Sequence, residues 1–169
     1  MIVVRPGHRG GFTLIELLII VAVVLVMSGM AVASMPRFRA DALLNAATEL
    51  QSVLAVTRET AIATRYPLSV TLNIASNSAS YTKPGGQAAT LQFNGTIGYS
   101  GDLGNGNLAL EFDAFGLPNA QVLPEGTSNL GNVTSDYRYV TLETKGGNFI
   151  VQVWIYENTG ETEIQWVKH

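Results

Sequence analysis

The chain has 169 residues, a formal net charge of −3 and a hydrophobic content of 47%. This length suits one small domain, since domains run to about 100 to 200 residues. The lack of cysteine excludes disulfide bonds, thiol nucleophiles and most zinc sites. The two histidines, His8 and His169, lie near the two ends of the chain, so no histidine is expected inside a folded active site.

A basic leader precedes a long apolar segment. Residues 1–11 contain Arg5, His8 and Arg9 but no acid, and in residues 12–35 the one charged side chain is Glu16. This apolar stretch exceeds the roughly 20 residues that a membrane-spanning helix needs. Because basic residues flank the cytoplasmic end of a span, the leader is expected in the cytoplasm and the rest of the chain outside it.

Three interpretations of the apolar segment are open. It can be a plain membrane anchor whose glutamate reaches the headgroups, or a secretory signal peptide cut at the small residues of Ala31-Val32-Ala33. In the third, the chain is cut just before Phe12. A charge in hydrocarbon costs at least about 2.5 kcal/mol, so Glu16 needs a partner, and a new amino terminus supplies one.

The leader, the glycine, the run Phe12-Thr13-Leu14-Ile15-Glu16 and the apolar stretch together resemble the type IV pilins and pseudopilins. This resemblance implies that a prepilin peptidase cuts after Gly11 and that the new amino group of Phe12 is methylated. It implies that Glu16 meets the amino terminus of a neighbouring subunit during assembly. It also implies a single-pass inner-membrane protein with a periplasmic domain, which is extracted into a filament.

Residues 36–66 are predicted to form an amphipathic second half of the same helix. Apolar residues recur there with helical spacing and share one face: Leu43, Ala47, Leu50, Leu54 and Ala61. Tyr66-Pro67 should end the helix, because the residue before a proline is driven out of the helical conformation.

Beyond Pro67 the hydrophobic period changes to two, which predicts a β domain over residues 67–169. Leu68, Val70, Leu72 and Ile74 alternate with polar residues. Further strands are expected at residues 80–82, 90–93, 108–112, 138–144, 148–156 and 163–167, the last three as an antiparallel meander. Glycine-containing turns are expected at 84–86, 145–147 and 158–160, and long loops at 97–107 and 119–136. The fold class is therefore α+β, with a long N-terminal helix on an antiparallel sheet in pilin-like order.

Two segments of the domain resemble the GspH/FimT family. One is the Arg58-x-x-Ala61-Ile62 run before Pro67, and the other is Phe112-x-x-x-Gly116. The resemblance implies a minor pilin-like subunit of a type II secretion pseudopilus, with a structural role in filament initiation or at the tip. The alternative is a minor type IV pilin for pilus biogenesis or DNA uptake. Implied partners are other pilins or pseudopilins, the prepilin peptidase, an inner-membrane assembly platform and membrane lipid.

Other chemistry has little support in the sequence. Glu111 and Asp113 could form a carboxylate pair on one face of a strand, and residues 102–107 offer oxygen ligands for calcium, but neither completes a known pattern. Aromatic residues on the predicted strands are expected to pack in cross-strand pairs. Beyond Tyr66, four Lys or Arg residues stand against nine Asp or Glu residues, which disfavours nucleic-acid binding despite Lys168-His169. No enzyme activity, cofactor or metal is expected.

Overall fold

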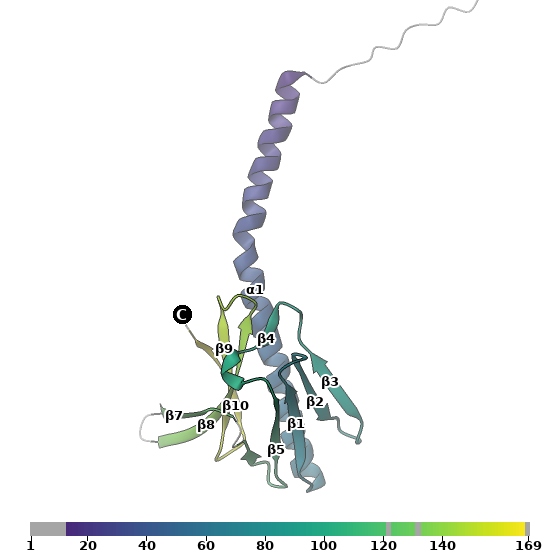
Figure 1. Ribbon diagram of the computed structural model, residues 1–169, viewed down its shortest axis with the longest axis vertical. Coiled ribbons are helices and arrows are strands. Elements are labelled where there is room, and N and C mark those ends of the chain that lie inside the picture. Colours follow the sequence, from purple (N-terminus) through teal and green to yellow (C-terminus); the bar gives the residue numbers. More distant parts are fainter. Residues whose placement is uncertain (1–12, 121–122, 131–132, 168–169) are drawn as a thin grey trace, which may run out of the picture. The chain divides into compact units, whose positions relative to one another are not determined.

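The computed structural model describes residues 13–120, 123–130 and 133–167, with side chains for all of these except residues 29–37, 127–130 and 133–135 (Figure 1). The chain divides into two compact units, Met1–Arg37 and Phe38–His169. Helix α1 (Leu14–Thr64) contributes residues to both units. The described residues of the second unit also form ten strands and one short 3-10 helix.

Within the second unit, α1 packs one face against the sheets, as the sequence predicts. Five predicted face residues are fully buried, namely Leu43, Ala47, Leu50, Leu54 and Ala61. The helix ends at Thr64, and Arg65 adopts a left-handed conformation with a φ of 53°. The amide of Tyr66 then donates to the carbonyl of Ala61 at 3.2 Å, which closes the last turn before Pro67.

The first sheet has the strand order β3-β2-β1-β5-β6, and all neighbouring strands are antiparallel. Its strands are β1 (Leu68–Asn73), β2 (Ser78–Thr82), β3 (Ala88–Gln92), β5 (Asn107–Phe112) and β6 (Pro118–Asn119). The alternation that predicts β1 is confirmed, because Val70 and Leu72 are fully buried while Leu68 and Ile74 pack against the core.

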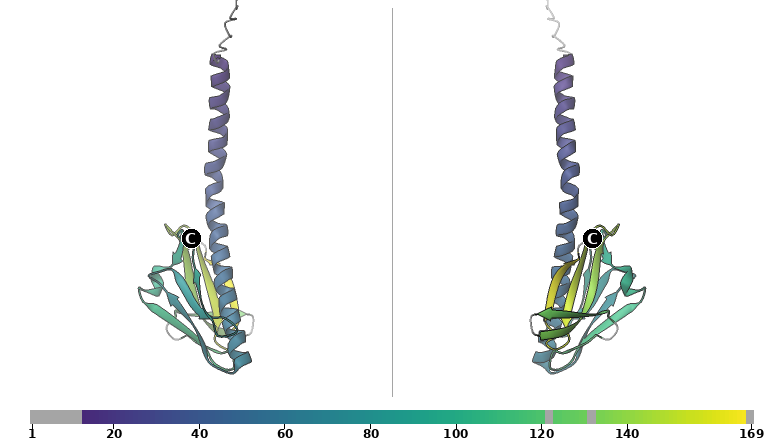
Figure 2. Two further views of the ribbon diagram at one scale, coloured as in Figure 1. Left: turned by 90° about the vertical axis from the view of Figure 1, so that its right-hand side faces the viewer. Right: turned by 90° about the vertical axis from the view of Figure 1, so that its left-hand side faces the viewer.

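The second sheet has the order β10-β9-β8-β4, with β7 also paired to β8. Its strands are β4 (Ile97–Tyr99), β7 (Glu125–Leu130), β8 (Val133–Thr144), β9 (Ile150–Tyr156) and β10 (Thr162–Val167). The predicted meander of the last three strands is confirmed by the β8–β9 and β9–β10 ladders. Figure 2 shows the strands of both sheets gathered against one side of the carboxyl-terminal part of α1.

The two predicted long loops are wrong in part. Residues 97–107 contain β4 and the 3-10 helix η1 (Gly101–Leu103), and residues 119–136 contain β7 and the beginning of β8. Strand β8 is long enough to hold two partners: β7 pairs with its first half and β4 with its last three residues. Both β4 and β7 pair with β8, a tertiary contact that the composition of these short segments does not reveal.

A single core lies between α1 and the inner faces of the two sheets. The helix contributes the five buried face residues, and the first sheet contributes Val70, Leu72, Leu110 and Phe112. The second sheet contributes buried side chains from β8 and β9, namely Val140, Leu142, Val151, Val153 and Ile155. The predicted α+β fold class, a long N-terminal helix packed on antiparallel β-sheet, is therefore confirmed.

Candidate functional site

The amino-terminal end of α1 carries a helix cap that involves the candidate assembly residue. The hydroxyl oxygen of Thr13 accepts a hydrogen bond from the amide of Glu16 at 3.3 Å, and the carbonyl of Thr13 accepts from Leu17. Thr13 therefore occupies the N-cap position and Glu16 the third helical position, the spacing of a capping box. This pairing was missed at the sequence level, although Thr-x-x-Glu before an apolar run is its known signature.

Glu16 lies in the first turn of α1, and its side chain is exposed. The unpaired amides at a helix start favour a negative charge, so the ionised carboxylate stabilises this helix end. The amino group expected at Phe12 could neutralise the Glu16 carboxylate, but Phe12 lies outside the described residues. Gly11 and His8 also lie outside them.

The helix that follows Glu16 is hydrophobic on every side. Its large apolar residues, from Leu17 to Met27, keep between 48% and 67% of their surface exposed. Ala22, Val23, Val26 and Met27 together form a continuous exposed apolar surface on one side of this helix. A helix that is hydrophobic all round requires an apolar environment, either lipid or other helices.

The predicted span, residues 12–35, includes Phe12 and the side chains of residues 29–35, which lie outside the description. Within the described part of the chain, no helix combines the length and the apolar character that crossing a membrane needs.

Comparison with known families finds a known motif at the amino-terminal end of the chain. Residues 7–32 match the prokaryotic N-terminal methylation motif. The chain carries a type IV pilin-like prepilin signal. This signal implies processing by a prepilin peptidase and assembly with other pilins, and it suggests a membrane-anchored amino terminus. Neither a curated protein nor a solved structure matches the chain.

Beyond the prepilin signal, the fold brings together the two domain segments that the sequence singles out. The Nε of Arg58, on α1, donates to the carbonyl of Gly116 at 3.3 Å. A Cβ atom on Gly116 would lie 2.6 Å from Cδ1 of Ile62, and Gly116 has a φ of 80°. Gly160, in the β9–β10 turn, packs so closely that a Cβ there would overlap the Gly116 carbonyl. Arg58, Ile62, Gly116 and Gly160 thus form one glycine junction between the helix and two turns.

The candidate carboxylate pair does not form. Glu111 is an exposed residue of β5, whereas Asp113 lies beyond the end of that strand, so the prediction that both share a strand face is wrong. Asp113 instead holds the β5–β6 turn: its Oδ1 accepts from the amides of Phe115 at 2.9 Å and Leu117 at 2.8 Å. An acid already used as a backbone acceptor serves the turn rather than acid–base chemistry.

The candidate calcium loop, residues 102–107, is occupied by part of η1 and by the start of β5. Ser100 caps η1 by accepting from the amide of Asp102. Among the described residues, no three His, Cys, Asp or Glu side chains come close enough together to hold a metal ion. Lys168 and His169 lie outside the described residues.

Aromatic side chains on the second sheet pack on one another, as predicted. The rings of Tyr137 and Trp154 stack with centroids 4.0 Å apart, and the Tyr137 ring also covers Gly126 on β7. Burial and the neighbouring Tyr139 raise the pKa of the Tyr137 hydroxyl. Because the stacked faces are already used, this cluster joins β7, β8 and β9 rather than offering a flat platform to a ligand.

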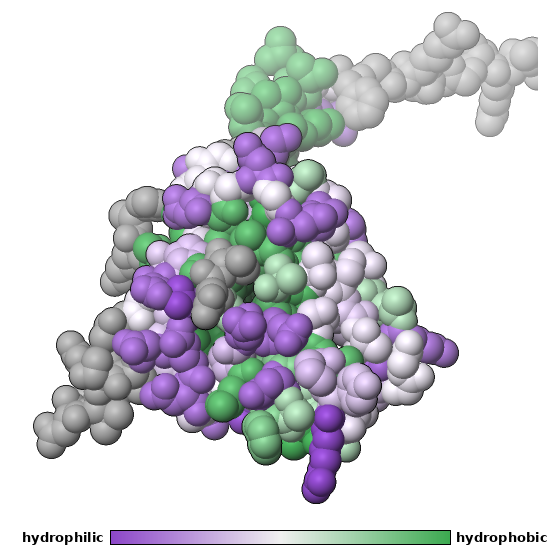
Figure 3. Space-filling view, turned by 60° about the horizontal axis from the view of Figure 1, so that its bottom comes forward, coloured by the Kyte–Doolittle hydropathy of each residue, from purple (hydrophilic) through white to green (hydrophobic). Residues whose placement is uncertain are grey.

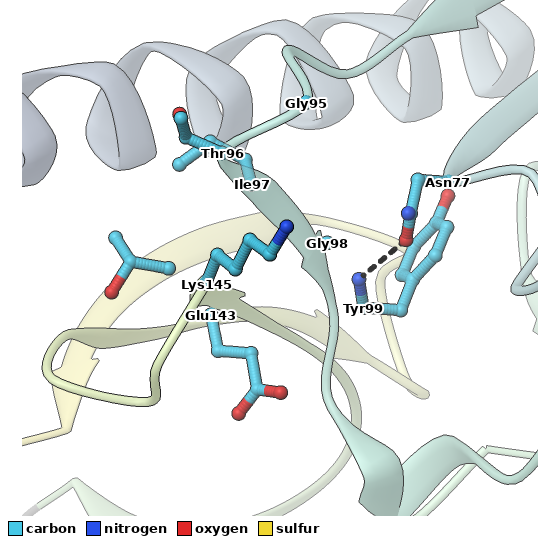
Figure 4. A pocket seen from close by; sticks show the side chains of 9 residues that line it. Asn77, Gly95, Thr96, Ile97, Gly98, Tyr99, Glu143 and Lys145 are labelled. Carbon is cyan, nitrogen blue, oxygen red and sulfur yellow. Dashed lines mark hydrogen bonds between the residues drawn. The ribbon is translucent and has the colours of Figure 1, made fainter.

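A polar hollow of about 300 Å³ lies where β4 meets the end of β8 (Figure 4). Asn77 accepts from the amide of Tyr99 at 3.2 Å on one side of it, and the Lys145 side chain reaches toward Gly98 while Glu143 is directed away. Lys145 and Glu143 carry opposite charges. The charges of these two residues cancel, so they give the hollow no net charge that would select an ion.

Proposed function

We propose that the protein is a minor pilin-like subunit of a type II secretion pseudopilus, which acts structurally in filament initiation or at the tip. The observation that carries this proposal is the prepilin signal at residues 7–32, joined to a helix whose later half packs on an antiparallel β domain. In this proposal, residues 1–11 are the leader, 12–35 the transmembrane half of the helix, 36–66 its amphipathic half, and 67–169 the periplasmic β domain.

Assembly in this proposal depends on charge pairing in lipid. Cleavage after Gly11 creates an amino terminus at Phe12, which is methylated and keeps its positive charge. Glu16 stands in the first turn of an otherwise apolar helix. A carboxylate in hydrocarbon is tolerated when it is paired, so Glu16 of one subunit binds the amino terminus of a neighbour. The Thr13 cap holds this helix turn in shape for that contact.

Secretion is favoured over DNA uptake by the charges of the second unit. Residues 38–169 contain seven Lys or Arg against twelve Asp or Glu. Arg138, a cation that could contact phosphate, has a side chain only 13% exposed and forms ion pairs with Glu125 and Glu157. Its guanidinium also donates to the carbonyl of Leu123 at 3.1 Å. DNA affinity comes largely from cations that neutralise phosphates, and here this cation is already neutralised.

Intact-mass measurement of the protein extracted from membranes tests the processing step. The expected mass is that of a chain that begins at methylated Phe12, and Gly11→Leu should leave the full-length chain uncut. A mature terminus at Ser34 would instead establish a cleaved signal peptide and overturn the proposal.

Co-purification tests the assembly step. Glu16→Ala should insert into the membrane as well as the wild type, because it removes a charge, but it should lose its association with partner pseudopilins. Glu49→Ala, an exposed glutamate on the same helix, is the matched control and should keep the partners. Equal recovery of partners with both variants would refute the role of Glu16. A mobility shift on duplex DNA at low salt, with the full chain in detergent, distinguishes the DNA-uptake alternative.

A further inference from the structure

Two exposed loops of the second unit contain an asparagine followed by a glycine. They are Asn94-Gly95, between β3 and β4, and Asn105-Gly106, between η1 and β5. All four residues are exposed, and hydrophilic side chains, purple in Figure 3, cover much of the surface of the domain. Asparagine is a chemically labile residue, and a following glycine has no Cβ atom to keep its backbone nitrogen away from the side-chain amide. Both dipeptides are therefore candidate sites of spontaneous deamidation.

Hydrogen bonds to the side-chain oxygen distinguish the two asparagines. Oδ1 of Asn94 accepts from the backbone amide of Thr96 at 3.1 Å and from the Thr96 hydroxyl at 3.2 Å. Among the residues that the structure describes, none forms a hydrogen bond with the side chain of Asn105. The amide carbonyl of Asn94 is thus polarised by two donors, whereas that of Asn105 meets only solvent.

The loop around Asn94 is fixed by its backbone. The carbonyl of Asn94 accepts from the amide of Ile97 at 2.8 Å, and the carbonyl of Thr96 accepts from the amide of Lys145 at 2.8 Å. Figure 4 shows Gly95 and Thr96 in the segment that leads into β4. The ring closed by the hydrogen bond from the Thr96 amide to Oδ1 includes the nitrogen of Gly95. This nitrogen is therefore held on the same side of Asn94 as the side-chain amide.

We propose that Asn94 is a site of spontaneous deamidation and that Thr96 accelerates the reaction, an inference that does not depend on the proposed function. The backbone nitrogen of Gly95 gives its proton to hydroxide and attacks Cγ of Asn94. Negative charge then develops on Oδ1, where the two Thr96 donors already point, so these donors stabilise the transition state. The bond from Cγ to Nδ2 breaks, and Nδ2 takes a proton from water and leaves as ammonia. The product is a five-membered succinimide.

Hydrolysis of the succinimide changes the loop in one of two ways. Water opens the ring at either carbonyl, which yields aspartate or isoaspartate at this position. Aspartate adds a negative charge next to the polar hollow that Gly95, Thr96 and Lys145 help to line, and it keeps an oxygen that Thr96 can bind. Isoaspartate routes the main chain through the former side chain, which lengthens the turn by one atom. The domain therefore becomes a mixture of charge forms as it ages.

Peptide mass mapping of the full chain in mild detergent tests this proposal. The protein is incubated at neutral and at mildly alkaline pH in heavy-oxygen water, and is then digested with pepsin in acid, where the reaction is slow. Heavy oxygen should appear at Asn94 at least about fivefold faster than at Asn105, a ratio that corresponds to about 1 kcal/mol, the net value of a hydrogen bond. The rate should rise with hydroxide concentration, because the attacking amide must first lose its proton.

Three variants isolate the contributions of Thr96 and Gly95. Thr96→Val removes the hydroxyl donor and should slow the reaction at Asn94 about fivefold. Thr96→Ser keeps the hydroxyl and should match the wild type. Gly95→Ala should slow the reaction severalfold by obstructing the attacking nitrogen, although apart from its chain neighbours a Cβ atom there meets nothing within 4 Å. The rate at Asn105 should be the same in all three variants.

Four results would each overturn the proposal. They are an unchanged Asn94, equal rates at Asn94 and Asn105 in the wild type, equal rates for Thr96→Val and Thr96→Ser, and a sugar attached to Asn94. The last is included because residues 94–96 also match the glycosylation triplet Asn-x-Thr, and a glycan on Nδ2 would remove the leaving group described above. The wild-type comparison needs no substitution, so misfolding of a variant leaves the test intact.

Discussion

The glycine junction makes a stability prediction with a close internal control. Gly160→Ala places a Cβ atom on a residue with a φ of 68°, where it overlaps the Gly116 carbonyl and lies 2.9 Å from Nε of Arg58. The left-handed conformation costs about 1–2 kcal/mol for alanine. Overpacking against a fixed backbone adds about 1–3 kcal/mol. Gly147→Ala, in the neighbouring β8–β9 turn, has a φ of 69° and nothing within 4 Å, so only the first cost applies.

The assay is urea unfolding of the full chain in mild detergent, followed by tryptophan fluorescence. Both tryptophans, Trp154 and Trp166, lie in the second unit, so the signal reports on that unit alone. With a slope of about 2 kcal/mol per molar urea, the extra cost of about 2 kcal/mol lowers the midpoint of Gly160→Ala about 1 M below that of Gly147→Ala. Equal midpoints for the two variants would show that the junction does not pack as described.

Three further variants test other contacts in the same assay. Arg65→Gly should stabilise the unit by about 1 kcal/mol, because glycine adopts the left-handed conformation without the Cβ penalty; an unchanged midpoint would contradict this. Burial raises the pKa of Tyr99 above its model-compound value of 10.0, so the contribution of Tyr99 to stability should be constant below pH 10 and fall above it. Tyr99→Phe should therefore lose about 1 kcal/mol at neutral pH and fall less in alkali than the wild type, and parallel pH curves for the two proteins would refute this. Arg138→Met should cost about 2 kcal/mol through its lost charged hydrogen bonds, and a wild-type midpoint would argue against the two ion pairs.

Much of the fold could be predicted because local pattern and tertiary environment agree. The buried face of α1 follows helical spacing from Leu43 to Ala61, and β1 follows strict alternation. Glycine-containing turns punctuate the sheet at the expected places, since Gly85, Gly146 and Gly160 all have positive φ. Where periodicity and turn chemistry indicate the same element, the structure contains that element.

The two incorrect loop predictions, at residues 97–107 and 119–136, have a common physical cause. β4 has only three residues and β7 contains Gly126 among mostly polar residues, so neither shows a strand pattern long enough to recognise in the sequence. Both are extended because β8 supplies their hydrogen-bonding partners, and the Tyr137 ring covers the gap above Gly126. The β8 residues that pair with β4 lie more than 40 positions further along the chain, where no local pattern reveals them, whereas β7 and β8 are consecutive strands.

Part of the candidate site could be predicted from the sequence, and part is visible only in the structure. Gly11, Phe12 and Glu16 form a linear signature that a single sequence reveals, and they lie within residues 7–32, which match the prokaryotic N-terminal methylation motif. The glycine junction could not be found in this way, because Arg58, Gly116 and Gly160 are far apart along the chain. The runs that contain Arg58 and Gly116 are recognisable as motifs in the sequence, but the contact between these two residues appears only in the folded domain.

The hydrogen bond from Gln51 to Thr162 joins residues 111 positions apart, and it ties the helix that begins the second unit to the strand that ends its sheet. Val151, Val153 and Ile155, which complete the core, also come from the last quarter of the chain. Part of the apolar face of α1 therefore stays uncovered until the last strands of the chain have been made. Because such non-local contacts form slowly, over milliseconds to seconds, the first half of the domain remains exposed to aggregation while it waits for its last strands.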